Sequence, residues 1–193
     1  MGRLYLIRHG RAAAGWTEDL DPDLDHLGKA QAEAMAAELS DILDRRGGGV
    51  PHIVSSPLRR ARSTAAALEK VWGVVATVDP SVGEVPSPPG ASGALSRRGE
   101  WLAAIMRSQW DDPAVPDDLR VWRAGVIDAL MRTDGDAVFT SHFVAINAAV
   151  GEAVGDTRVT CFRPDYCSRT ILDVEGGALR LVELGGEAST SVR

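Results

Sequence analysis

The chain has 193 residues, of which 45% are hydrophobic and 25% charged, an ordinary composition for a globular protein. Its 21 Lys and Arg residues and 27 Asp and Glu residues give a net charge of −6, which argues against a nucleic-acid or anionic-membrane surface. We expect one domain over residues 1–185 and a flexible tail over 186–193. Cys161 and Cys167 have neither zinc-site nor redox-pair spacing, so free thiols in a reducing cytoplasm are expected.

The first predicted element is a strand over Arg3–Ile7, a short apolar run that stops at Arg8, His9 and Gly10. The run is too short for a secretory or membrane-spanning segment. Ligands of open α/β sheets collect at the carboxyl ends of the strands. We therefore expect Arg8 and His9 to form the floor of an anion site.

A polar loop over Arg11–Asp23 follows, and the next apolar residues recur at helical spacing. This pattern predicts a helix over Leu27–Leu43 with Asp25 as its N-cap. Three consecutive glycines, Gly47–Gly49, should end the helix. They lack the spacing of a phosphate-binding loop, so a turn is the better interpretation.

A second strand is predicted over Pro51–Ser55, followed by a helix over Leu58–Val71 with Pro57 as its first residue. Cations near a helix N-terminus interact unfavourably with the helix dipole. Arginines at this position therefore suggest that at least one of them has a functional role. The first turn carries three such residues: Arg59, Arg60 and Arg62.

A third strand is predicted over Val74–Val78. The loop that follows, Asp79–Gly93, is rich in Pro, Gly and Ser and carries one acid, Glu84. Long loops in compact domains are often functional. Helices are expected over Ser96–Trp110 and Pro116–Arg132.

A fourth strand over Ala137–Thr140 ends at Ser141 and His142, and a buried helix is expected over Val144–Val154. Ser168–Leu184 reads as a hairpin at the sheet edge. Strands that alternate with helices predict an α/β fold. We expect a three-layer α/β/α sandwich with a mostly parallel central sheet and an antiparallel edge strand.

Three strand ends should converge, bringing together Arg8 and His9, the turn over Ser55–Arg62, and His142. A guanidinium presents a planar fork that suits phosphate oxygens and stays charged at any working pH. Helix N-termini after Ser56 and after His142 would add backbone N–H donors. The sequence thus predicts a site for a phosphoryl group.

These segments together resemble, in order, those of the histidine phosphatase superfamily, also called phosphoglycerate mutase-like. Each motif is short, but the set covers nearly the whole chain. The matching pieces are Leu6–Gly10, Ser55–Ala65, Glu84, Ser141–His142 and Pro164–Thr170.

The resemblance implies that His9 is the nucleophile that becomes phosphohistidine. It implies that Arg8 and Arg60 bind the phosphate, that His142 is the second pocket histidine, and that Glu84 is the general acid. The roles of the other two arginines of that turn stay open.

Physical chemistry supports these roles. A nucleophilic imidazole must be unprotonated on the attacking nitrogen, and adjacent guanidiniums disfavour a second positive charge. A hydrogen bond from the other ring nitrogen would fix the tautomer, but the sequence does not identify its acceptor. Glu84 would protonate the leaving alkoxide and then activate water. The arginines neutralise the phosphate charge, so neither a metal nor another cofactor is expected.

Two positions depart from the family pattern. Ala12 stands where many members carry a small hydroxyl residue, and Gly15 stands where mutases have Asn. The chain also lacks the extra length with which mutases cover the pocket, and an open pocket admits water. We therefore expect a metal-independent phosphomonoesterase acting on a small phosphorylated metabolite, cytoplasmic, and monomeric or homodimeric. The alternatives are a phosphoglycerate-type mutase, a protein phosphohistidine phosphatase and a non-catalytic phosphate-ligand binding protein.

Overall fold

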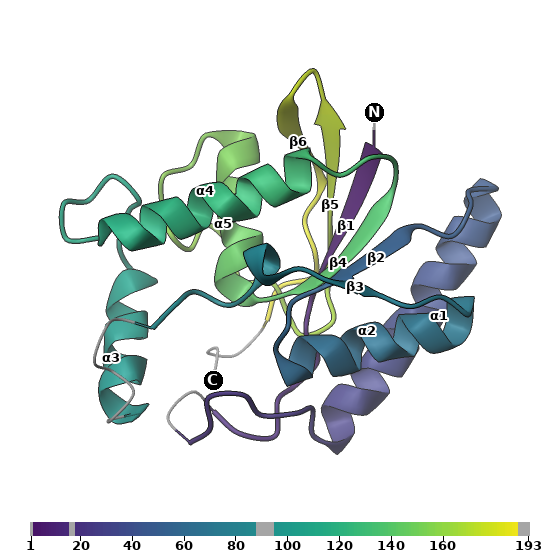
Figure 1. The fold of residues 1–193 in the computed structure, drawn as a ribbon, viewed down its shortest axis with the longest axis horizontal. Coiled ribbons are helices and arrows are strands. Elements are labelled where there is room, and N and C mark those ends of the chain that lie inside the picture. The colour runs from purple at the N-terminus through teal and green to yellow at the C-terminus, as the bar shows by residue number, and fades with distance from the viewer. Residues whose placement is uncertain (1, 16–17, 88–94, 189–193) are drawn as a thin grey trace.

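The structure is a computed structural model that describes residues 2–15, 18–87 and 95–188 (Figure 1). Six strands form one sheet in the order β3-β2-β4-β1-β5-β6. The strands are β1 (Gly2–Arg8), β2 (His52–Ser55), β3 (Thr77–Val78), β4 (Ala137–Ser141), β5 (Arg169–Glu175) and β6 (Ala178–Glu183). The helices are α1 (His26–Arg46), α2 (Arg59–Trp72), the 3-10 turn η1 (Pro80–Val82), α3 (Leu95–Ile105), α4 (Asp117–Met131) and α5 (Phe143–Val154).

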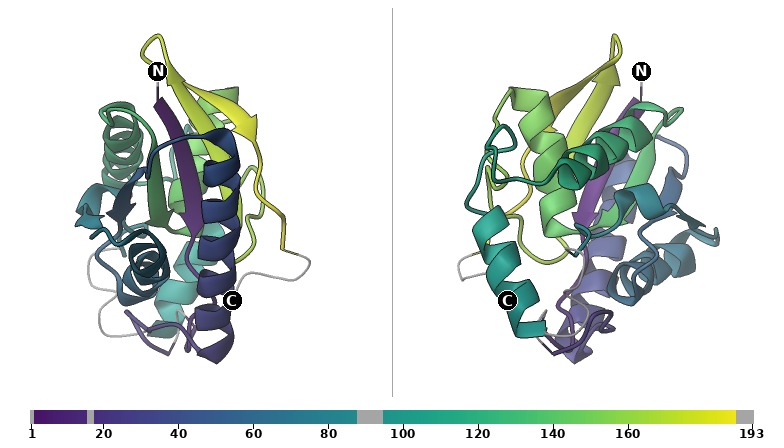
Figure 2. Two further views of the ribbon diagram at one scale, coloured as in Figure 1. Left: turned by 90° about the vertical axis from the view of Figure 1, so that its right-hand side faces the viewer. Right: turned by 60° about the vertical axis from the view of Figure 1, so that its left-hand side comes forward.

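Helices cover both faces of the sheet, because the side chains of each strand alternate between the faces. In β1, Tyr5 and Ile7 pack with α1 and α2, whereas Leu4 and Leu6 pack with α4 and α5. In Figure 2 the long α1 lies alongside β1. The expected α/β/α sandwich is confirmed.

Strands β1 to β4 are parallel, so β1, β2 and β4 end at the same edge of the sheet. Strand β5 pairs antiparallel with both β1 and β6, which gives the predicted hairpin at the opposite side of the sheet from β3. The parallel strands run from the end of the molecule where the N-terminus lies toward the end that holds α3 and residues 11–15 and 18–25 (Figure 1). The carboxyl ends of β1, β2 and β4 therefore lie on that side of the molecule.

Several predicted boundaries differ from the structure. Helix α2 begins at Arg59 with Leu58 as its N-cap, so Pro57 is not its first residue. The third strand has only two residues, both exposed, instead of the five expected. Helix α3 ends at Ile105, before the predicted end at Trp110. The capping predictions for α1 are confirmed, because Asp25 accepts from the Gly28 N–H and the αL glycine that follows Arg46 ends the helix.

The C-terminal segment also differs from the expected flexible tail. The Asp165 N–H donates to the Gly186 carbonyl at 2.8 Å, and the Ala188 N–H donates to the Arg163 carbonyl at 2.9 Å. Residues 186–188 are therefore hydrogen-bonded to the rest of the chain. The remaining part of the predicted tail, 189–193, lies outside the described residues.

Two glycines let the chain after β1 cross the first turn of α1. A Cβ on Gly28 would lie 2.1 Å from the Arg11 carbonyl oxygen, and a Cβ on Gly10 would lie 2.5 Å from the Gly28 carbonyl oxygen. Real Cβ atoms do not approach backbone this closely, so both positions require glycine. Within residues 2–15, 18–87 and 95–188, none of the helices combines the length and apolar character needed to cross a membrane.

Candidate active site

Backbone hydrogen bonds align the ends of β1, β2 and β4. The His9 N–H donates to the Ser141 carbonyl, and the Ser56 N–H donates to the Thr140 carbonyl, both at 3.0 Å. These bonds continue the parallel ladder one residue past each strand. The structure thus brings His9 beside His142, with ring centroids 5.2 Å apart.

The hydrogen bonds of His9 define its tautomer. Its Nδ1 lies 2.8 Å from the Gly10 carbonyl oxygen, which only accepts, so Nδ1 carries the proton. The other ring nitrogen, Nε2, is therefore unprotonated, and its lone pair accepts from Arg60 Nε at 3.2 Å. The carbonyl of the next residue is the acceptor that sequence reasoning did not identify.

Both pocket histidines are held neutral. Burial lowers the pKa of His9 well below its usual 6.5, and the neighbouring His142 and the guanidiniums of Arg60 and Arg8 lower it further. Burial followed by the charges of Arg60 and Arg8 does the same to the pKa of His142. A neutral His9 keeps the Nε2 lone pair available at physiological pH.

Arg60 contacts both His9 and Glu84. Its guanidinium is buried; besides the contact to His9, its Nη2 lies 3.3 Å from Glu84 Oε2. Its Nη1 is 3.9 Å from Asp21 Oδ1 and has no hydrogen-bond partner in the described part of the chain. A buried guanidinium with a vacant N–H is suited to bind an oxyanion.

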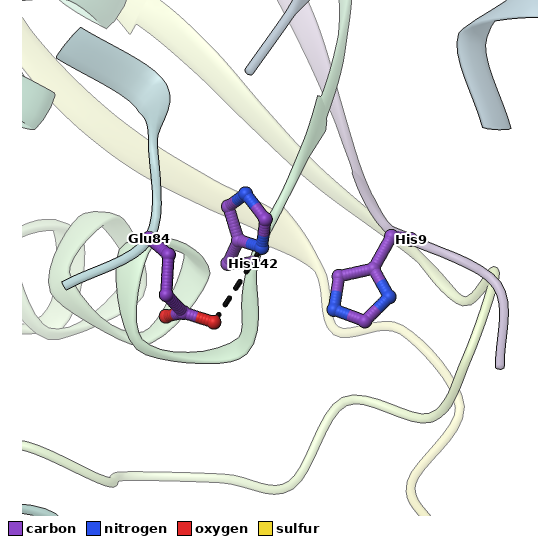
Figure 3. A group of neighbouring side chains, drawn as sticks. All are labelled: His9, Glu84 and His142. Carbon is purple, nitrogen blue, oxygen red and sulfur yellow. Dashed lines mark ion pairs between the residues drawn. The ribbon is translucent and has the colours of Figure 1, made fainter. Parts of the chain in front are cut away.

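Glu84 and His142 face each other at the rear of the site (Figure 3). The Glu84 side chain is 3% exposed, and its Oε2 lies 3.5 Å from His142 Nδ1. The other nitrogen, Nε2, lies 2.7 Å from Ser56 Oγ, which accepts from the Leu58 N–H at 3.3 Å. The Ser56 hydroxyl can donate to Nε2 or accept from it, so this contact fits either tautomer of His142. Nδ1 lies toward Glu84 and has no hydrogen-bond partner among the described residues.

Arg8 is buried at the end of β1, and burial lowers the pKa of its guanidinium below the usual 12.5. Its Nη1 donates to the Pro164 carbonyl at 2.9 Å, while its Nε has no partner among the residues described. The Tyr166 ring lies 4.0 Å from the guanidinium carbon. Arg8 is therefore held from one side and retains donor capacity.

The site opens into a cavity of about 550 Å³, a size typical of small-molecule sites. Arg8, His9, Arg60 and Tyr166 line it, together with residues 11–15, 18, 22, 25 and 99. Because cations dominate the buried part, the cavity is suited to an anionic group attached to a small molecule.

One side-chain set also has metal-binding geometry. Ligand atoms of His9, Glu84 and His142 lie within 4.8 Å of one another. However, Arg60 donates to two of these three residues, so a metal ion would have to displace a buried guanidinium. The charge of the site favours an anion over a cation.

A sequence profile of the histidine phosphatase superfamily, branch 1, matches residues 4–186. The chain belongs to this superfamily. The match covers nearly all of the chain and includes every predicted site residue.

Solved structures of histidine phosphatases have the same fold. Mycobacterial glucosyl-3-phosphoglycerate phosphatase in complex with VO3 has a TM-score of 0.69 and 24% identity, over 97% of this chain and 100% of that one. A mutant phosphoserine phosphatase from Entamoeba histolytica, in complex with phosphoserine, has a TM-score of 0.67 and 19% identity, over 95% and 96% of the two chains. No curated protein sequence gives a significant match.

Sequence reasoning missed three residues of this histidine phosphatase site. Arg98 of α3 is 6% exposed, its charge interacts with those of Glu84 and Arg60, and its Nη1 has no partner in the part described. Asp21 accepts from the Arg59 N–H at 2.8 Å and so occupies the N-terminus of α2, which we had expected to remain free for phosphate. The third is Tyr166, which lines the cavity.

The other two arginines of the α2 turn do not enter the site. The side chain of Arg59 is 62% exposed and lies 3.8 Å from Asp23 Oδ2, and Arg62 is exposed. Of the three arginines in this turn, only Arg60 is buried against His9. Arg60 is therefore the arginine of this turn that the structure places beside His9, and its role in phosphate binding stays a prediction.

Proposed function

We propose that this histidine phosphatase hydrolyses phosphomonoesters of a small metabolite through a phosphohistidine on His9. The observation that carries the proposal is the His9 tautomer, with Nδ1–H on the Gly10 carbonyl and the Nε2 lone pair beside Arg60. An unprotonated ring nitrogen among buried guanidiniums is what nucleophilic attack on a phosphoryl group requires.

In the first step, the lone pair of His9 Nε2 forms a bond to phosphorus while the bond from phosphorus to the ester oxygen breaks. The electron pair of that bond goes to the leaving oxygen, which takes a proton from Glu84. Arg8, Arg60 and the His142 Nδ1–H donate to the equatorial oxygens, where the charge of the transition state lies.

In the second step, water attacks the phosphohistidine. The Glu84 carboxylate takes a proton from the water, an oxygen–phosphorus bond forms, and the N–P electron pair returns to His9 Nε2. Inorganic phosphate leaves, and the site regains its starting protonation. Because the arginines neutralise the phosphate, we propose that the reaction needs no metal ion.

We propose hydrolysis in place of mutase transfer, because the cavity that the described residues line would admit water to the intermediate. Transfer of labelled phosphate from substrate to product would indicate a mutase. Binding of phosphate without release from any ester would indicate a binding protein. A cytoplasmic location and a monomeric or homodimeric state remain predictions.

The test is a phosphate-release screen over phosphorylated metabolites, phosphohistidine peptides and p-nitrophenyl phosphate. We expect activity that survives chelators, is inhibited by vanadate and is absent in His9→Ala. His52→Ala is the matched control, because His52 is exposed at the start of β2 and should leave the rate unchanged. Release that persists in His9→Ala, or no release from any ester, would contradict the proposal.

A further inference from the structure

The segment Pro164–Ser168 holds Arg8 at its backbone as well as at its side chain. The Cys167 N–H donates to the Arg8 carbonyl at 2.9 Å, and the Arg8 N–H donates to the Ser168 carbonyl at 3.4 Å. The Pro164 carbonyl accepts from the guanidinium of the same arginine at 2.9 Å. This short segment thus contacts both the backbone and the guanidinium of Arg8, which lies more than 150 positions earlier in the chain.

A tight turn directs Tyr166 at the guanidinium. The next residue, Cys167, has a φ of 55°, in the left-handed region that non-glycine residues seldom adopt. The Tyr166 N–H donates to Asp165 Oδ1 at 2.8 Å, which fixes the start of the turn. Backbone strain of this kind persists only where the surroundings hold it in place.

The ring of Tyr166 lies close to both Arg8 and His9. Its centroid is 4.0 Å from the guanidinium carbon of Arg8 and 6.0 Å from the centroid of the His9 ring. A second ring, Phe143, lies 5.4 Å from the same guanidinium. Cation–π contact of this kind is strongest where water is excluded, as at this buried arginine.

An arginine side chain has several rotatable bonds, so its fork binds an oxyanion tightly only if its plane is fixed beforehand. We propose that Tyr166 is a positioning residue that holds the Arg8 guanidinium in the plane that meets the phosphoryl group. This inference rests on the proposed function, and it assigns a role to a family-like segment that the mechanism itself does not use.

The test measures orthovanadate binding by calorimetry, which needs no turnover, together with kcat and KM for p-nitrophenyl phosphate. Tyr166→Phe keeps the ring and should bind vanadate within about twofold of the wild type. Tyr166→Leu and Tyr166→Gln remove the ring and should weaken binding by up to about 30-fold, the equivalent of a desolvated cation–π contact of about 2 kcal/mol. Two replacements are used because one of them could disturb folding, which thermal unfolding reveals.

The inference is overturned if the ring-less variants bind vanadate as tightly as the wild type. It is also overturned if Tyr166→Phe loses as much as they do, because the hydroxyl would then be the active group. A wild type that binds no vanadate overturns it as well. A wild type that binds vanadate but releases no phosphate contradicts only the proposed function, and the variants still decide the role of Tyr166.

Discussion

Replacing Glu84 with Gln should separate two roles of this residue, proton donation and charge pairing with Arg60. Its carboxyl group, when protonated, supplies the proton in the proposed mechanism, and its ionised form is the buried counter-charge of Arg60, 3.3 Å away. Gln has the same shape and keeps an acceptor oxygen, but it cannot supply a proton and carries no charge. Glu84→Gln should therefore slow the chemistry and tighten anion binding at the same time.

The size of each effect follows from the geometry. An oxyanion bound to Arg60 would lie close to the Glu84 carboxylate, and two like unit charges about 6 Å apart repel by about 3 kcal/mol at an effective dielectric constant of ~20. Removing this repulsion should tighten vanadate binding by up to about 100-fold. Loss of the acid should lower kcat on alkyl phosphates by roughly 100- to 10,000-fold.

The assay compares kcat on an alkyl phosphate with kcat on p-nitrophenyl phosphate, together with vanadate affinity. Nitrophenolate leaves without a proton, so its ester should lose far less activity than the alkyl ester. Equal losses on both esters would refute the acid assignment. Vanadate affinity that is unchanged or weaker would refute the argument that Glu84 competes with the ligand for Arg60.

Further predictions concern charge and pH. Arg60→Met leaves the Glu84 carboxylate buried and unpaired, so urea unfolding should show a loss of about 3–5 kcal/mol. Arg98→Met removes a buried cation with a vacant N–H, so the same measurement should show little loss or a gain, while vanadate binding weakens. The folded-state pKa values of His9 and His142 lie below the unfolded value near 6.5, so the unfolded chain binds more protons below that pH. The free energy of unfolding should fall as pH drops from 7 to 5, by at most about 1.4 kcal/mol per pH unit per histidine, and His142→Asn should flatten that slope. A slope that His142→Asn leaves unchanged would count against a neutral His142.

The sequence predicted features that depend on local chemistry. The strand predicted over Arg3–Ile7, which the structure extends to Gly2–Arg8, and the cap at Asp25 follow from apolar spacing and from side chains that bond the nearby backbone. The convergence of the strand ends followed from parallel topology, and the arginine choice followed from the family motif. The structure places those side chains together, and their catalytic roles remain proposals.

Features set by tertiary contacts were not predictable. Nothing local distinguishes the buried Arg98 from a surface arginine, because its burial depends on where α3 lies against the Glu84 loop. The Gly10 acceptor of His9 is a backbone carbonyl, which every residue carries. The third strand has only two residues because it forms the exposed edge of the sheet, where neighbouring valines lack a packing partner.

The crossing of Gly10 and Gly28 makes the proposed reaction depend on two residues that have no side chain. A Cβ at either position would overlap backbone of the crossing segment, so the chain after His9 would have to move away from α1, and we expect the His9 ring to lose its position. Substitutions at these two glycines should therefore lower the activity, although neither glycine lines the cavity. A random screen for folded but inactive variants should return these glycines alongside the histidines and arginines.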